Sequence, residues 1–137
     1  MGARDQKPHG NGDACPFCHV PAAEVVASNK HAVARRDRYP LTDGHTLVIP
    51  RRHVRSVFDL DPDEQLAVWD LVAAVRDELL LTPGVGAVNV GINDGEAAGQ
   101  TVPHAHVHVI PRRKGDVPDP RGGVRWILPE RAPYWKE

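Results

Sequence analysis

The stretch Pro-His-Ala-His-Val-His-Val-Ile-Pro, residues 103–111, alternates histidines with small apolar side chains. Because successive side chains on a strand point to opposite faces of a sheet, this pattern predicts a strand with His104, His106 and His108 on one face. Neighbouring imidazoles of the row would lie about 6.6 Å apart along the strand. The other face is apolar, so we expect it to pack against a helix.

A helix that suits this role is predicted upstream of the strand. Asp61 is a good N-cap, Pro62 fits the first helical position, and Glu64 stands at the capping-box offset. Apolar residues then recur at three- and four-residue spacing, which predicts one stripe on a helix of about twenty residues. The residues of this stripe are Leu66, Trp69, Val72, Val75 and Leu79.

Short apolar stretches separated by turn residues predict the remaining strands. One long helix among about five strands, in mostly short-range order, indicates an α+β domain with a largely antiparallel sheet. The predicted strands, besides residues 103–111, are residues 24–27, 31–37, 45–49 and 85–93.

The two ends of the chain differ in composition from the domain between them, which we place at residues 14–115. Residues 1–13 are polar and show no periodicity, which predicts a disordered segment. Residues 116–137 are rich in proline and arginine, and we expect a tail that wraps the domain.

Two interpretations of this tail are open. In the first, Arg121 and Arg125 would reach over the functional site of the domain toward the distal phosphates of a ligand, with Trp126 stacking near its base. In the alternative, the tail is only a charged segment that Trp126 anchors to the core.

Charge and hydropathy argue against several classes of partner. The 137 residues contain 17 Lys plus Arg and 18 Asp plus Glu, so the formal net charge of −1 gives no bias toward nucleic acid or anionic membranes. No stretch approaches the roughly 20 apolar residues that span a bilayer, and the N-terminal residues lack an apolar signal core. We expect a cytoplasmic protein without nucleic-acid or membrane partners.

The histidine row indicates chemistry, since partly desolvating three imidazoles is unfavourable unless something uses them. Either the row binds a metal, or one neutral imidazole attacks phosphorus while its neighbours donate hydrogen bonds to the phosphate oxygens. The preceding loop, residues 94–101, carries glycines with amide and hydroxyl donors, which favours phosphorus. We interpret His9, His19 and His31 as ordinary surface residues.

Residues 99–110 resemble the His-x-His-x-His signature of the histidine-triad (HIT) superfamily of nucleotide hydrolases and transferases. Residues 44–53, Gly-His-Thr-Leu-Val-Ile-Pro-Arg-Arg-His, resemble the upstream motif of that family, and Asp37 precedes them at the family's distance. The resemblance covers about residues 14–115. It implies a HIT-like fold, with a mainly antiparallel sheet of about five strands on one long helix, plus a short helix. His108 is typical of the hydrolase branches, which are Hint-like and fragile-histidine-triad-like.

The resemblance also implies roles for individual residues. His106 would be the nucleophile that forms a covalent nucleotidyl-imidazole at the α-phosphorus of an adenylate, and His108 and His45 would contact the phosphate and the leaving group. Asp37 would accept hydrogen bonds from the ribose hydroxyls. The residues implied to bind phosphate oxygens are Asn93, Gly99, Gln100 and Thr101.

The implied activity is hydrolysis of a dinucleoside polyphosphate or an adenosine phosphoramidate, with release of a nucleoside monophosphate. The alternative is a nucleotide-binding sensor or regulatory protein in which slow catalysis is incidental. The resemblance further implies a homodimer and no organic cofactor.

The only two cysteines form the motif Cys15-Pro-Phe-Cys18. This spacing suits a zinc knuckle or a redox pair, and a zinc site would need two more ligands from elsewhere in the chain. The resemblance implies a structural zinc completed by His53 and His104. In the alternative, both cysteines are reduced free thiols.

Overall fold

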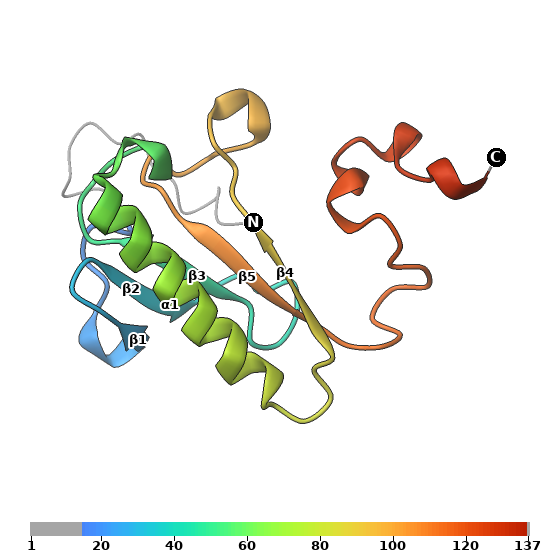
Figure 1. Cartoon of the computed structure of the whole chain (residues 1–137), viewed down its shortest axis with the longest axis horizontal. Helices are drawn as coiled ribbons and strands as arrows, with labels where there is room; N and C mark the ends of the chain where they lie inside the picture. The colour runs from blue at the N-terminus through green and yellow to red at the C-terminus, as the bar shows by residue number, and fades with distance from the viewer. Residues whose placement is uncertain (1–14, 137) are drawn as a thin grey trace.

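An antiparallel sheet of five strands forms the centre of the computed structural model, which describes residues 15–136 (Figure 1). The strand order is β1-β2-β3-β5-β4, and every neighbouring pair is antiparallel. The predicted α+β class is confirmed, whereas the expectation for residues 1–13 lies outside the described residues. The strands are β1 (Val25–Ser28), β2 (Ala32–Arg36), β3 (Thr46–Pro50), β4 (Ala87–Gly91) and β5 (Val107–Arg112).

Helix α1 (Pro62–Leu80) begins where the sequence predicts, with the backbone N–H of Asp61 donating to Glu64 Oε1 at 2.9 Å. The predicted apolar stripe is partly wrong, because Leu66 and Trp69 are 62% and 42% exposed. Each three-residue step turns about 60° short of a full circle, so a stripe built from such steps rotates away from the core. The stripe that is buried consists of Val68, Leu71, Val72, Val75 and Leu79.

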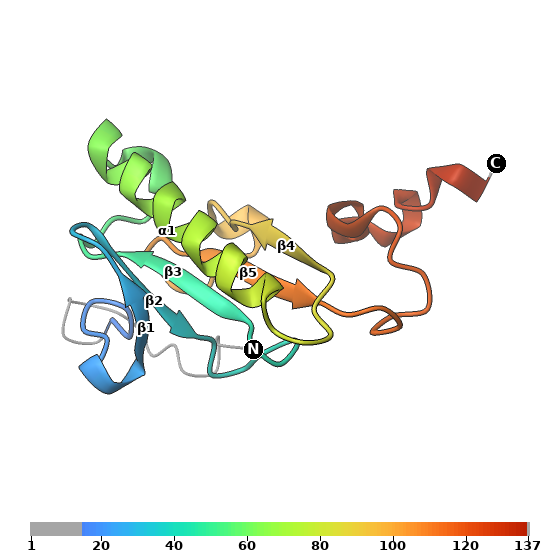
Figure 2. The same cartoon turned by 60° about the horizontal axis from the view of Figure 1, so that its bottom comes forward.

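The helix covers one face of the sheet (Figure 2), and Phe17 and Val20 of the segment before β1 pack against part of the other. On the helix side, small and β-branched residues such as Ala34 and Val107 pack against α1. On the opposite side, Leu47 and Ile49 pack against Phe17 of the N-terminal segment. Within residues 15–136 no helix is both long and apolar enough to cross a bilayer.

Besides α1, the only helices in the described part of the chain are short 3-10 helices, and these stand in place of the short helix that the resemblance implies. The first is followed directly by β1, and the last three lie in the C-terminal tail. These turns are η3 (Ala22–Glu24), η4 (Val57–Asp59), η5 (Glu96–Ala98), η6 (Gly123–Ile127), η7 (Pro129–Arg131) and η8 (Tyr134–Lys136).

The C-terminal tail extends beyond the β4 edge of the sheet, away from α1 (Figures 1 and 2). It does not wrap the domain as its composition led us to expect. The reason is that its cationic and aromatic side chains contact each other, with the guanidinium of Arg121 4.8 Å from the Trp135 ring and that of Arg125 4.6 Å from the Tyr134 ring. The tail therefore forms a small unit of its own beside β4.

The loop between β2 and β3 depends on a glycine that packs under the helix. Gly44 has a φ of +101°, and a Cβ there would lie 3.2 Å from Leu79 Cδ2 and 3.3 Å from Pro111 Cγ. We expect Gly44→Ala to lower the free energy of unfolding by about 1–3 kcal/mol, measured by urea denaturation, because strain and crowding add. Gly86→Ala is the control, since no atom approaches its Cβ position within 4 Å, and it should change stability by less than about 0.5 kcal/mol. Equal losses in both variants would contradict this reading of the loop.

Candidate active site and metal site

The histidine row lies on the sheet face opposite α1, as the alternation predicts. Strand β5 begins only at Val107, but the backbone N–H of Ala105 donates to Val54 O at 2.7 Å and holds the preceding residues beside the chain that follows β3. Ala105 and Val107 are buried in the core under the helix. His104, His106 and His108 therefore point to the other side of the sheet.

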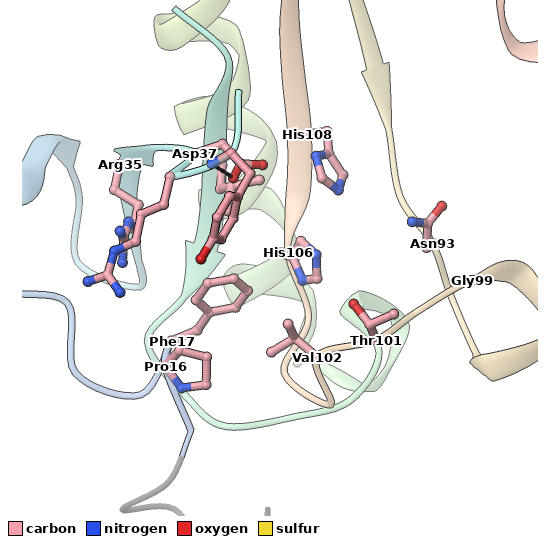
Figure 3. A pocket seen from close by; sticks show the side chains of 13 residues that line it. Pro16, Phe17, Arg35, Asp37, Asn93, Gly99, Thr101, Val102, His106 and His108 are labelled. Carbon is pink, nitrogen blue, oxygen red and sulfur yellow. Dashed lines mark hydrogen bonds between the residues drawn. The ribbon is translucent and has the colours of Figure 1, made fainter. Parts of the chain in front are cut away.

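His106 has a defined tautomer. Its Nδ1 lies 2.9 Å from the carbonyl oxygen of His104, and because a carbonyl only accepts, Nδ1 carries the proton and Nε2 keeps its lone pair. His106 is 9% exposed and lines a pocket (Figure 3). Burial lowers its pKa, so the ring is neutral at neutral pH. A neutral imidazole with a free Nε2 is the form that acts as a nucleophile.

The tautomers of His45 and His108 are also defined, because hydrogen bonds connect Leu41, His45 and His108 in series. The backbone N–H of Leu41 donates to His45 Nδ1 at 3.1 Å, so the proton of His45 is on Nε2. That Nε2–H donates to His108 Nδ1 at 2.9 Å, which leaves the proton of His108 on its own Nε2. Burial, and then the neighbouring His106 and His45, lower the pKa of His108 to about 4. His108 is thus a neutral donor at the pocket.

His45 does not line the pocket that contains His106 and His108, although together with Asp37 it lines a second pocket. Its ring is 1% exposed, and its Nε2–H contacts His108. Asp37 lines the pocket, and its Oδ1 accepts from the backbone N–H of Tyr39 at 2.9 Å. Its Oδ2 lies 3.5 Å from His45 Nε2. Asp37 therefore connects the pocket wall to the His45–His108 pair.

The pocket brings together residues from both ends of the domain (Figure 3). Six of its lining residues were expected from the sequence, namely Asp37, Asn93, Gly99, Thr101, His106 and His108. The others were missed, although Arg35 stands two residues before Asp37 at the end of β2 and so shares its face. The missed residues are Pro16, Phe17, Arg35, Arg38, Tyr39, Leu47 and Val102.

Gln100 does not line the pocket, in contrast to its neighbours Gly99 and Thr101. Its Nε2 donates to the carbonyl oxygens of Arg55 at 2.8 Å and Val102 at 3.0 Å. Its Oε1 accepts from a backbone N–H of the same loop, so the amide is used to hold the loop in place.

Arg121, Arg125 and Trp126 of the tail do not line the pocket either. Arg121 pairs with Asp119 at 3.0 Å, and the guanidinium of Arg125 donates to Ala132 O at 3.0 Å. The indole N–H of Trp126 donates to Arg121 O at 2.8 Å. These side chains hold the turns of the tail, which disfavours a reach toward distal phosphates.

A second cluster contains the four residues expected to hold zinc, and their ligand atoms all lie within 4.8 Å of one another. His104 Nδ1 is 3.4 Å from Cys15 Sγ and 3.0 Å from His53 Nδ1, and Cys18 Sγ is 3.2 Å from His53 Nδ1. Tetrahedral zinc with ordinary bond lengths needs nitrogen–sulfur separations of about 3.6 Å and nitrogen–nitrogen separations of about 3.3 Å. These separations match the zinc values to within a few tenths of an ångström.

The protonation states in this cluster also suit a metal. His104 Nε2 lies 2.8 Å from Pro50 O, so its proton is on Nε2 and its Nδ1 lone pair faces the cysteines. Burial lowers the pKa of His104 to about 4, which keeps this ligand neutral. Burial, and then the neighbouring Cys15, raise the pKa of Cys18 to about 11, so this thiol needs a bound cation to lose its proton at neutral pH.

Residues 20–115, which hold the sheet, α1 and the histidine row, match the family model of the HIT domain. The chain belongs to the HIT family. The resemblance stated from the motifs is thereby confirmed, and so is the HIT fold, because solved structures of the family superpose on this chain.

Relatives of this HIT chain include proteins named as hydrolases. The bis(5'-nucleosyl)-tetraphosphatase (asymmetrical) of Schizosaccharomyces pombe is 42% identical over 94 residues, which are 69% of this chain and 52% of that protein. The chain thus spans about half the length of this relative. The crystal structure of the NitFhit protein of Caenorhabditis elegans has a TM-score of 0.69 at 37% identity, over 73% of this chain and 24% of that one.

One solved relative is described as binding zinc. The crystal structure of a zinc-bound histidine-triad family protein from Mycobacterium smegmatis has a TM-score of 0.63 at 34% identity. The match covers 80% of this HIT chain and 86% of the mycobacterial one.

Proposed function

We propose that this HIT chain is a nucleotide hydrolase that cleaves at the α-phosphate of an adenine nucleotide through a covalent intermediate on His106. The observation that carries the proposal is the hydrogen bond from His106 Nδ1 to His104 O, which leaves Nε2 free in the pocket. The names of the relatives, a bis-nucleosyl tetraphosphatase and a fragile-histidine-triad fusion protein, support the same reaction class.

The reaction would take place in two displacements. His106 Nε2 attacks the α-phosphorus, a nitrogen–phosphorus bond forms, and the bond to the leaving group breaks. The positive charge that develops on the ring is stabilised through Nδ1–H and the carbonyl oxygen of His104. A phosphate leaving group departs as an anion, whereas an amine would take up one proton from solvent as it departs. Water then attacks the same phosphorus, releases the nucleoside monophosphate, returns its proton to solvent and restores neutral His106.

The remaining pocket residues would bind the substrate. His108 Nε2–H is a donor for a non-bridging oxygen or the leaving group, and it is held for that role by the pair with His45. Asn93, Gly99 and Thr101 line the same pocket and would contact the phosphates. Asp37 would accept from the ribose hydroxyls, since its carboxylate also faces the pocket.

We also propose that Cys15, Cys18, His53 and His104 hold a structural zinc ion. Such an ion would link the turn of Cys15 and Cys18 to the strand that carries His106. A homodimer and a cytoplasmic location, both expected from the sequence, stay predictions.

The experiment that tests the hydrolase proposal is a substrate panel with a trapping step. Wild-type protein is mixed with diadenosine tetraphosphate, diadenosine triphosphate or an adenosine phosphoramidate, and AMP release is measured. In a rapid quench with substrate labelled at the α-phosphate, we expect protein-bound label that is stable in alkali and labile in acid, as a phosphoramidate is. No AMP release from any of these substrates would overturn the proposal.

The low pKa of His108 predicts a loss of stability in mild acid. The pKa is about 4 in the folded chain and about 6.5 in the unfolded chain, so between these values the unfolded chain binds a proton that the folded chain excludes. The contribution of neutral His108 to the free energy of unfolding is therefore complete above pH 6.5 and is lost as the pH falls toward 4. From this group alone we expect a loss of about 2 kcal/mol between pH 7 and pH 5.

Urea unfolding of the wild type and of His108→Gln, each at pH 7 and at pH 5, measures this contribution of His108. The variant lacks the titrating group but keeps the other histidines and the cysteines, so metal release and their titration affect both proteins alike. The wild type should lose about 2 kcal/mol more than the variant. Equal pH dependence in the two proteins would show that His108 titrates normally.

A further inference from the structure

The turn Cys15-Pro16-Phe17-Cys18 belongs to both sites at once. Its first and last residues present their thiols to His104 and His53. Pro16 and Phe17, between them, line the nucleotide pocket (Figure 3). The same four-residue turn is therefore one side of the metal cluster and one wall of the pocket.

Phe17 is in contact with the catalytic strand as well as with the pocket. Its ring stands edge-on to His106, with centroids 5.0 Å apart and an interplanar angle of 68°. It also packs against Leu47 and Ile49 of β3. Phe17, Leu47 and Val102 are apolar side chains among the residues that line the pocket, which also include Gly99 and Thr101. The ring of Phe17 suits contact with a flat apolar group such as a nucleobase, and Gly99 and Thr101 suit phosphates.

The hydrogen bonds that hold the backbone and the thiols of this turn are weak. Its backbone bond, from Cys18 N–H to Cys15 O, is long at 3.4 Å. The thiol contacts with His53 and His104 are sulfur hydrogen bonds, which are weak. Coordination of an ion by all four ligands would replace these contacts with metal–ligand bonds to two other segments of the chain. The position of Phe17 would then be fixed by the metal.

We infer that metal binding and nucleotide binding in this chain are coupled through Phe17, whose ring the metal-loaded turn holds in place as the apolar wall of the nucleoside subsite. The inference rests on the proposed function, because it takes the ligand of the pocket to be an adenine nucleotide. Coupling between two sites is reciprocal, so the metal strengthens nucleotide binding by the same factor by which the nucleotide strengthens metal binding. A factor of about ten lies within the usual range.

The first measurement compares the 137-residue chain loaded with zinc and the same chain freed of zinc by dialysis against a chelator. Calorimetric titration with AMP should give a Kd about tenfold higher without zinc. Competition with a chromophoric chelator should give a zinc Kd about tenfold lower in saturating AMP. Equal AMP affinities with and without zinc would overturn the coupling and leave the proposed function standing. No AMP binding by the zinc-loaded chain would contradict both.

The second measurement uses Phe17→Ala, which keeps all four ligands and stays informative even where the zinc-free wild type unfolds. The zinc-loaded variant should retain one zinc per chain, as the wild type is expected to, and bind AMP about tenfold more weakly than the wild type. His19→Ala is the matched control, since His19 follows Cys18 directly, is exposed and belongs to neither site, and it should match the wild type in both affinities. Wild-type AMP affinity in zinc-loaded Phe17→Ala would refute the role of Phe17.

Discussion

His106→Ala is expected to lower kcat for AMP release by about 10⁴-fold or more, while the variant stays folded and still binds AMP. The loss is large because the free Nε2 of His106 is the atom that forms the covalent bond, and no other pocket residue presents a neutral imidazole nitrogen without a proton. His108 has its proton on Nε2, and the Nε2 of His104 donates to Pro50 O. Steady-state kinetics and AMP titration measure the two effects separately.

Two variants control this result. His19→Ala removes an exposed histidine and should keep wild-type turnover. His108→Gln keeps an N–H donor but not the imidazole geometry, and we expect a smaller loss of about 10²-fold. Turnover of the same substrates by His106→Ala would contradict the assignment of the nucleophile. A wild-type kcat far below the roughly 10 s⁻¹ typical of enzymes, combined with tight AMP binding, would favour the sensor alternative.

Loss of the metal site is expected to have the largest effect on stability. Protein prepared without chelator should contain about one zinc per chain, and Cys15→Ser should contain much less. At a free zinc concentration a thousandfold above its Kd, the ion stabilises the fold by about 4 kcal/mol. For a domain of this size that corresponds to a fall in Tm of more than about 10 °C on chelation.

The effect has a structural reason, because the ligands come from three distant parts of the chain. Cys15 and Cys18 precede β1, His53 follows β3, and His104 precedes β5, so the ion would close loops between all of them. Elemental analysis and thermal unfolding, with and without chelator, measure the two quantities. Metal-free protein with an unchanged Tm in chelator would support the alternative of two free thiols.

The fold was predictable where the pattern is local. Alternation in residues 103–111 and the Asp61 capping box identify β5 and α1 because period and capping depend on neighbours in the sequence. The stripe of α1 was partly wrong, since Leu66 and Val68 are both apolar and only the fit against the sheet decides which is buried. The tail was misjudged because its aromatic and cationic residues pack on each other.

The sequence predicts which histidines share one face of the sheet, but not which nitrogen of each ring carries the proton. The motifs bring His104, His106 and His108 to one face, yet the proton on each ring depends on backbone groups such as Pro50 O, which no motif contains. The resemblance implies a phosphate contact for His45, but it does not contain the hydrogen bonds of this ring with Leu41 N–H and His108, which depend on the folded loop.

The separation of the proposed zinc ligands along the chain would set the moment at which this site forms during synthesis. Cys15 and His104 are 89 residues apart, so the ligand set becomes complete only after nearly all of the domain has left the ribosome. At about 5–20 residues per second, the cysteines would wait roughly 4–18 s for their last partner. His104 comes just before β5, which joins β3 to β4 within the sheet. A nascent chain would therefore capture its ion only as β5 completes the sheet, and a truncated chain would not retain it.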